Sequence, residues 1–206
     1  GRGYLEMKFR GAEAIVETIH WNGIKSISKT RNTRSYRHPK LEKRLVKERM
    51  RSECRIINRL ISHGVPVPAI YSVDVTNSQI YMEFLEGVTL EKALRTKDYS
   101  SYLSETANLL SLIHSIGIVH GDPTTSNFIV NDIIYAIDFG LSFMSCDDEA
   151  RASDLRVLLE SLEAHHSEIL GRETFLQVYA QWEGSYSVIQ AFQILEQRGR
   201  YNLMRG

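Results

Sequence analysis

Three polar residues at set spacing, Asp122, Asn127 and Asp138, most strongly constrain how this chain folds. Four residues separate Asp122 from Asn127, and two short β-rich runs, 128–130 and 133–137, then lead directly into Asp138-Phe139-Gly140. A strand pair between two loops brings both loops to the base of one cleft. A purely structural alternative, in which Asp122 caps a turn and Asp138 ends a buried strand, explains each residue singly. It explains the three together poorly.

These residue types at this spacing suit phosphoryl transfer. That reaction needs a carboxylate to orient the attacking hydroxyl and oxygen ligands to hold magnesium on the phosphates. The segment from His120 to Gly140 resembles the catalytic and metal loops of the kinase superfamily. The resemblance implies that ATP and magnesium are bound, with Asp122 as the catalytic aspartate and Asn127 and Asp138 as metal ligands.

A carboxylate inside an apolar helical pattern gives a second clue. Glu53 follows Met50 by three residues and precedes Ile57 by four, on the inward stripe of its helix. A buried carboxylate needs a partner. The kinase fold pairs such a glutamate with a strand lysine that holds the ATP phosphates, so Lys29 is the predicted partner and Lys25 the second choice. Ordinary surface charges are the alternative.

The hydrophobic pattern changes character near Glu86 and predicts two lobes. Before it, an Asn22-Gly23 pair and a Thr76-Asn77-Ser78 turn each divide alternating runs, which predicts two hairpins. A helix is expected between them over 39–62, with Leu41, Leu45, Met50, Ile57, Leu60 and Ile61 at helical spacing. After Glu86, helices are expected at 89–95, 99–116, 153–164, 167–182 and 185–197. The predicted fold is α+β, a minimal bilobal kinase-like fold with a small antiparallel-sheet lobe over 7–86 and a reduced, mostly helical lobe over 87–197.

Other segments receive predicted roles from their position in such a fold. The link Glu83-Phe84-Leu85, just after Met82, is expected to bind adenine through its backbone. Gly11-Ala12-Glu13 offers only one glycine where a Gly-x-Gly-x-x-Gly loop would cover the phosphates. No Ala-Pro-Glu follows Gly140, so the activation loop and the peptide platform are nearly absent.

Charge and composition bound the partners. The chain has 25 basic and 25 acidic residues, but residues 25–55 hold twelve Lys or Arg against three Glu, a local excess of nine charges. This segment is a candidate contact for RNA, with a solvated helix face as the alternative. No apolar run approaches the roughly 20 residues that span a bilayer, so no membrane partner is expected. The two cysteines have no paired spacing, so neither a disulfide framework nor a zinc site is expected. Residues 1–6, before Met7, are interpreted as an expression remnant.

Several further motifs together resemble one family over residues 8–206. They are Gly11-Ala12-Glu13-Ala14, Tyr36-Arg37-His38-Pro39 with Leu41-Glu42, Thr124-Thr125-Ser126-Asn127, Asp138-Phe139-Gly140-Leu141-Ser142-Phe143, Asp154-Leu155 and Arg198-Gly199-Arg200. They are similar to the PRPK family, the small atypical Ser/Thr kinase subunit of the KEOPS (EKC) complex. The resemblance implies kinase and ATPase activity in support of threonylcarbamoyladenosine modification of tRNA. It also implies a partner subunit of the ASKHA type, a small regulatory subunit and a cytoplasmic location, with a nuclear one as well in a eukaryote.

Two departures and two alternatives stay open. The family usually has Leu after the catalytic aspartate, where this chain has Pro123, which pushes Asp122 toward extended backbone. The His-Gly-Asp triplet also occurs in aminoglycoside and choline kinases, so a small-molecule kinase is one alternative, and a pseudokinase that only binds partners is another. The basic tail 198–206 lacks a helical apolar stripe and is expected to order only against a partner.

Overall fold

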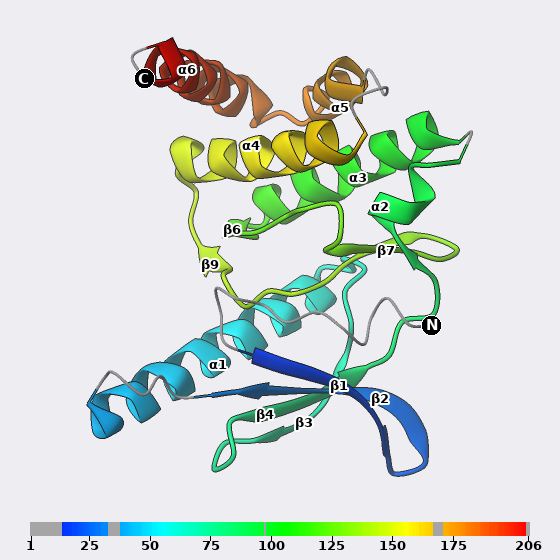
Figure 1. Cartoon of the computed structure of the whole chain (residues 1–206), viewed down its shortest axis with the longest axis vertical. Helices are drawn as coiled ribbons and strands as arrows, with labels where there is room; N and C mark the ends of the chain where they lie inside the picture. The colour runs from blue at the N-terminus through cyan, green and yellow to red at the C-terminus, as the bar shows by residue number, and fades with distance from the viewer. Residues whose placement is uncertain (1–13, 33–37, 97, 167–170, 205–206) are drawn as a thin grey trace.

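The computed structural model describes residues 14–32, 38–96, 98–166 and 171–204. Two lobes are visible in Figure 1, a sheet with one long helix below and a group of helices above. One hydrophobic core runs through both lobes, from Ile27 and Ile80 in the sheet to Leu110 and Phe192 among the helices. The predicted bilobal α+β architecture is therefore confirmed.

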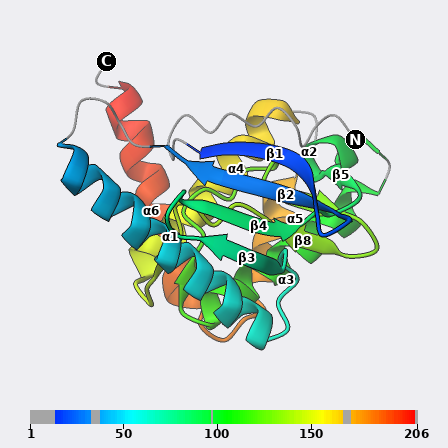
Figure 2. The same ribbon diagram turned by 90° about the horizontal axis from the view of Figure 1, so that it is seen from below.

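The lower lobe contains an antiparallel sheet of four strands in the order β1-β2-β4-β3, which Figure 2 shows side by side. Asn22 and Gly23 both have positive φ, 50° and 79°, as a tight hairpin turn with the right-handed strand twist requires. Both predicted hairpins are present, and Lys29 lies within the second strand of the first hairpin. The strands are β1 (Ala14–Trp21), β2 (Ile24–Arg31), β3 (Ile70–Asp74) and β4 (Gln79–Glu83).

The helix α1 (Pro39–Ser62) has the predicted bounds but a different buried face. Leu41, Leu45 and Ile61 are exposed, between 37% and 49%, although the periodicity placed them inward. The buried stripe contains Glu42, Val46, Met50, Glu53, Ile56, Ile57 and Leu60. The periodicity did not reveal this buried face because one of its residues, Glu42, is a carboxylate. Apolar spacing alone favours Leu41 and Leu45, each of which precedes a buried residue by one position.

The upper lobe is mostly helical, with α3 packed on α5 and α4 packed on α6. Its helices are α2 (Leu90–Ala93), α3 (Tyr99–Ser115), α4 (Asp148–His165), α5 (Gly171–Tyr179) and α6 (Ser185–Met204). The helix α4 begins five residues before the predicted start because the Asp147 side chain caps it, accepting from the Glu149 N–H at 3.4 Å. Among the described residues, none of the helices is both long and apolar enough to cross a bilayer.

Short strands position the loops between the lobes. The predicted pair β7 (Phe128–Val130) and β8 (Ile134–Ala136) is present, extended by β5 (Val88–Thr89). The strand β6 (Ile118–Val119) pairs with β9 (Phe143–Met144). We did not predict β5, β6 or β9, since two-residue strands carry no periodicity. The lobes are also joined through the backbone, because the Ala136 N–H donates to the Pro66 carbonyl at 3.0 Å.

The C-terminal segment differs from the prediction. The helix α6 continues through Met204, so residues 198–204 are helical, although the sequence predicted an unordered tail. The Arg198 guanidinium lies 3.9 Å from the Glu149 carboxylate, and that of Arg200 lies 3.7 Å from the Glu196 carboxylate. Leu203 and Met204 are more than 80% exposed. Helix propagation from the packed turns before residue 198 continues the helix without a buried stripe.

Candidate active site

A cleft lies between the sheet and the segment that follows β8. Its walls are mainly apolar, and three ionisable side chains, Lys29, Glu53 and Asp138, project into it. The apolar lining comes from both lobes: Val16, Ile27, Ile57, Pro68, Met82, Ile137 and Phe139. An apolar cleft with a few convergent charges is typical of a small-molecule site.

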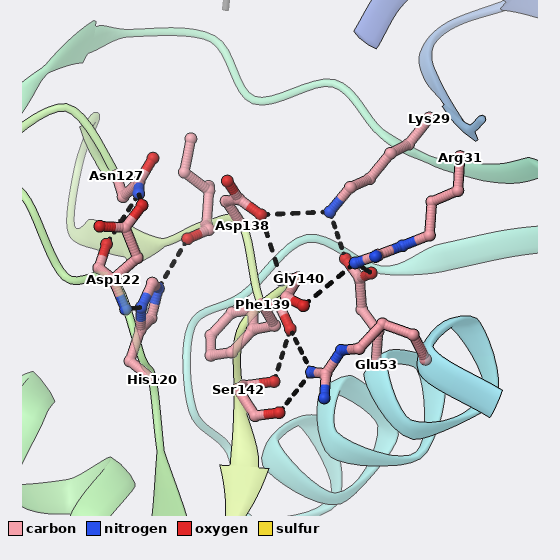
Figure 3. A network of polar contacts seen from close by, with 12 residues as sticks. Lys29, Arg31, Glu53, His120, Asp122, Asn127, Asp138, Phe139, Gly140 and Ser142 are labelled. Carbon is pink, nitrogen blue, oxygen red and sulfur yellow. Dashed lines mark hydrogen bonds and ion pairs between the residues drawn. The ribbon is translucent and has the colours of Figure 1, made fainter. Parts of the chain in front are cut away.

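The predicted ion pair between β2 and α1 is present. The Lys29 ammonium lies 2.5 Å from Glu53 Oε1 and 3.1 Å from Asp138 Oδ1, and the Glu53 side chain is only 1% exposed (Figure 3). Burial lowers the pKa of Lys29, but the two carboxylates outweigh burial and hold that pKa above its ordinary 10.5. Lys29 is therefore a buried cation at neutral pH, at the cleft. Lys25, the second choice, lies instead over the Phe84 ring, 4.0 Å from its centroid.

Asp138 adopts a backbone conformation that few residues other than glycine tolerate. Its φ is 60°, and its Oδ1 accepts from the Gly140 N–H at 3.1 Å as well as from Lys29. Burial raises the pKa of Asp138, but the Lys29 charge and the Gly140 N–H outweigh burial and lower that pKa below its usual 3.8. Left-handed backbone at a non-glycine residue costs of order 1–3 kcal/mol and tends to occur at functional sites.

The loop between β6 and β7 brings Asp122 and Asn127 together. Asn127 Nδ2 donates to the Asp122 carbonyl at 2.8 Å and lies 3.4 Å from Asp122 Oδ2. His120 Nδ1 accepts from the Asp122 N–H at 3.1 Å, so its Nε2 is the protonated nitrogen and donates to the Ile137 carbonyl at 2.8 Å. His120 thus joins this loop to the strand that leads into Asp138 (Figure 3). Burial raises the pKa of the Asp122 carboxyl above 3.8.

Asp154 of α4 anchors the same loop to the helical lobe. Its carboxylate accepts from the His120 N–H at 2.8 Å and from the Gly121 N–H at 2.9 Å. It also lies 2.8 Å from His114 Nε2, and the Tyr179 hydroxyl lies 2.8 Å from His114 Nδ1. Asp154 belongs to the Asp154-Leu155 motif of the sequence, but no role was predicted for it. Its signal was the same as that of Glu53, a carboxylate between the buried residues of an apolar helix.

Gly121 is required by a close approach. It has φ of 92°, and a Cβ atom there would lie 2.3 Å from the Leu141 carbonyl oxygen. A side chain at this position is therefore excluded unless the chain after Asp138 moves.

The oxygen atoms that could act as metal ligands at this site suit magnesium. Asn127 Oδ1 is buried and has no hydrogen-bond partner among the described residues, which is costly unless a cation or another donor meets it. Magnesium is commonly bound by one or two carboxylates together with waters and substrate phosphates. Within the described parts of the chain, no group of three or more His, Cys, Asp or Glu could hold a metal ion. A site formed by Asp138 and Asn127 would therefore depend on phosphate oxygens for its remaining ligands.

The residues predicted to bind adenine lie at the edge of the cleft. Met82 lines it, but Glu83, Phe84 and Leu85 are not among its lining residues. The Glu83 N–H donates to the Ala69 carbonyl at 2.8 Å, and its side chain accepts from the Ala69 N–H at 3.1 Å, so Glu83 closes the sheet. Gly11, Ala12 and Glu13 fall outside the described residues. Their nucleotide-binding roles remain predictions.

The basic segment 25–55 has a partly internal role. Lys29 and Arg31 are buried at Glu53, and the half-buried Arg49 donates to backbone carbonyls of the Asp138–Ser142 segment. Among the described residues of this segment, Lys25, Lys40, Lys43, Arg44, Arg51 and Arg55 are exposed, and Lys47 is partly exposed. The electrostatic surface available to RNA is therefore smaller than the sequence count suggests, and contact with RNA remains a prediction.

Comparison with known proteins places this geometry in a family. The RIO domain model matches residues 13–161. The EKC/KEOPS complex subunit bud32 of Dictyostelium discoideum is 34% identical over 93% of this chain and 81% of its own length. The KEOPS complex subunit Bud32 of Pyrococcus abyssi is 36% identical over 93% of this chain and 94% of its own length.

A longer relative and a solved structure extend the comparison. A probable bifunctional tRNA threonylcarbamoyladenosine biosynthesis protein of Methanocorpusculum labreanum is 41% identical over 97% of this chain, which spans only 37% of that protein. The Rio2 kinase from Chaetomium thermophilum, solved as an ADP/Mg²⁺-phosphoaspartate complex, shares the fold with a TM-score of 0.65 at 13% identity, over 92% of this chain and 70% of that chain. The family model covers the segment that holds the residues of the site, and the two Bud32 relatives match over nearly the whole chain. The chain therefore belongs to the RIO domain family of kinase-like proteins, in the group that contains the Bud32 subunits of KEOPS complexes.

Proposed function

We propose that this chain is an ATP- and magnesium-dependent phosphotransferase that transfers the γ-phosphoryl group to a serine or threonine hydroxyl or to water. The observation that carries the proposal is the buried Lys29, held between the Glu53 and Asp138 carboxylates at the cleft. A cation that remains charged inside an apolar cleft is suited to an anionic ligand such as a triphosphate. Asn127 Oδ1 is buried and unpartnered within the part of the chain that the structure describes, which supports a metal ion beside it.

Each residue would then have one task. Lys29 would bind phosphate oxygens, with Glu53 fixing the direction of its side chain. Asp138 and Asn127 would hold magnesium, which neutralises charge on the phosphates when bound. Asp122 would orient the attacking hydroxyl or water through its carboxylate, while His120 and Asp154 hold the loop that carries it.

The names of the relatives support a role in tRNA modification. The Bud32 relatives are named as KEOPS complex subunits, and the longer relative as a tRNA threonylcarbamoyladenosine biosynthesis protein. We therefore propose that this chain acts in the cytoplasm, and in the nucleus of a eukaryote, beside an ASKHA-type transferase subunit and a small regulatory subunit. Its ATPase activity would serve the modification of tRNA.

A thermal-shift titration with ATP, with and without magnesium, tests the nucleotide part. ATP at about a hundred times its Kd would stabilise the folded chain by about 2.7 kcal/mol. For a chain of this size that raises the Tm by roughly 5–10 °C. The shift should be larger with magnesium and should be reduced in Lys29→Met. An absence of any shift with ATP and magnesium would favour a pseudokinase and contradict the proposal.

The acceptor is tested separately. Release of inorganic phosphate from labelled ATP measures transfer to water, and labelling of the chain or of added protein measures transfer to hydroxyl groups. We expect phosphate release to exceed protein labelling, because only residues 141–147 separate Gly140 from α4, which leaves little room for a peptide platform.

A further inference from the structure

Backbone carbonyl groups of the segment that follows Asp138 face two arginines of the lower lobe. One guanidinium nitrogen of Arg31 donates to the Gly140 carbonyl at 3.1 Å. One of Arg49 donates to the Phe139 carbonyl at 3.2 Å and to the Ser142 carbonyl. We call residues 138–142 the metal loop. Three of its carbonyl oxygens therefore accept from side chains that belong to the other lobe.

Arg31 also completes a ring of polar contacts around this loop. Its guanidinium lies 3.2 Å from Glu53 Oε2, while the other oxygen of the same carboxylate holds Lys29. Lys29 contacts Asp138 at one end of the loop, and Arg31 contacts Gly140 two residues later. Figure 3 shows this ring of dashed contacts. Glu53 thus orients both the cation at the cleft and the cation on the loop.

Arg49 supports the ring from one helical turn away. It precedes Glu53 by four residues on α1, so both side chains lie on the same side of the helix. Burial and the nearby positive charge of Arg31 lower the pKa of Arg49. Placing a second cation beside Arg31 is unfavourable unless acceptors offset it, and the loop carbonyls are the acceptors it has.

These contacts address a known requirement of kinase sites. The lysine–glutamate pair and the metal-binding aspartate must be in place together, and in many kinases phosphorylation of the activation loop controls this arrangement. Here the connection from Gly140 to α4 is short, and β9 within it is paired with β6. Asp138 also holds a costly left-handed conformation, which persists only when its surroundings enforce it.

Resting on the proposed function, we propose that Arg31 and Arg49 are positioning residues that hold the metal loop in its magnesium-binding arrangement without phosphorylation of the chain. They take the place that an ordered activation loop has in other kinases. The site would be assembled before nucleotide arrives. Regulation would then have to act on access to the cleft or on a partner, not on a phosphate in residues 141–147.

Hydrogen exchange of the nucleotide-free protein tests the arrangement directly. In Arg31→Met and Arg49→Met we expect residues 138–144 to exchange about tenfold faster or more, the factor for one lost charge-assisted hydrogen bond. Arg156→Met is the matched control, because Arg156 forms an exposed pair with Glu160 on α4. It should leave this segment unchanged. Wild-type exchange rates in both loop variants would overturn the proposal.

Nucleotide binding gives a second readout. Adding magnesium should raise the ATP affinity of the wild type, and both Met variants should lose about tenfold of that gain while ATP binding without magnesium changes little. An unchanged magnesium gain would contradict the proposal. If a Met variant does not fold, Arg31→Lys and Arg49→Lys carry the test, since lysine keeps the charge but not the two-pronged guanidinium. Intermediate exchange supports the proposal, and wild-type exchange in both Lys variants overturns it.

The role of phosphorylation is tested on wild-type protein dephosphorylated with a phosphatase and verified by intact mass. We expect its ATP turnover to equal that of the untreated protein. A tenfold or greater rise in turnover on phosphorylation within 141–147 would overturn the proposal. If the wild type binds no ATP at all, the proposed function fails, whereas the exchange result on the nucleotide-free protein still decides whether the arginines hold the loop.

Discussion

Replacement of Glu53 with glutamine leaves two buried cations without their shared carboxylate. The side chains of Lys29 and Arg31 are only 6% and 8% exposed, so water cannot replace Glu53 as their partner. The glutamine oxygen can accept from one cation, but its amide N–H groups then face the other. Lys29 keeps Asp138 at 3.1 Å, and Arg31 keeps the Gly140 carbonyl.

The expected cost follows from burial. Breaking a buried ion pair by removing one partner typically costs about 3–5 kcal/mol, because the remaining charge is desolvated and uncompensated. For a chain of about 200 residues, each kcal/mol lowers the Tm by about 2–4 °C. We therefore expect Glu53→Gln to lower the Tm by roughly 10 °C, measured by circular dichroism and checked by urea denaturation.

Glu160→Gln on α4 is the matched control. Glu160 pairs with Arg156 at 2.8 Å, but its side chain is 61% exposed. Exposed helix pairs are worth about 0.5 kcal/mol or less, so the control should barely change the Tm. If Glu53→Gln costs no more than Glu160→Gln, the buried network does not stabilise the fold as argued.

The sign of the pH dependence adds a further check. The folded-state pKa of Lys29 is raised above 10.5, so its stabilisation is fully present below that value and is lost as the pH rises through the folded-state pKa. Removing Glu53 removes the largest opposition to burial, which lowers the folded-state pKa. The stability difference between wild type and Glu53→Gln should therefore narrow as the pH rises above 10.5. A difference that widens there would refute this assignment.

Four other predictions follow from the site and the surface. Asp138→Ala should abolish magnesium-dependent ATP turnover while the circular dichroism spectrum stays native; full turnover would contradict a metal role. Asp122→Ala should lower kcat at least 100-fold while ATP affinity is retained, and loss of ATP binding would contradict the role given to Asp122. Turnover of the wild type should fall toward acidic pH, as the pH passes through the raised pKa of Asp122. Charge reversal at Lys43 and Lys47 should weaken tRNA association and flatten its salt dependence, and an unchanged slope would favour a solvated helix face. Deletion of 198–206 should leave the Tm nearly unchanged and weaken complex formation; full partner affinity would show that this segment is dispensable.

Much of the frame could be predicted because local signals determine it. The Asn22-Gly23 pair demands a tight hairpin, and Glu53 within an apolar stripe demands a buried cation. Together with the lysine–glutamate pair that the kinase fold implies, those two signals favoured Lys29 over Lys25 as the partner on the strand beside α1. The spacing of Asp122, Asn127 and Asp138, with the resemblance to kinases, likewise predicted that the two loops carrying them lie close together.

The parts that were missed depend on partners far away in the chain. Arg31 and Arg49 bond to backbone carbonyls about 90 to 110 residues later, and carbonyls leave no trace in a sequence. The strands β6 and β9 exist only because two loops meet. The helical end of α6 was missed for the opposite reason, since helix propagation needs no apolar stripe once earlier turns are packed.

The left-handed glycine before the catalytic aspartate also constrains how such a chain can diverge. Many kinases carry arginine at this position, in a His-Arg-Asp triplet. In this chain any side chain at Gly121 would collide with the Leu141 carbonyl, so a single codon change to arginine would displace the metal loop before it gave any benefit. A lineage that starts from this structure must first move the chain at Leu141. Gaining the His-Arg-Asp triplet of kinases that are controlled by activation-loop phosphorylation would therefore take two coordinated changes. This glycine is thus a barrier between two branches of one fold.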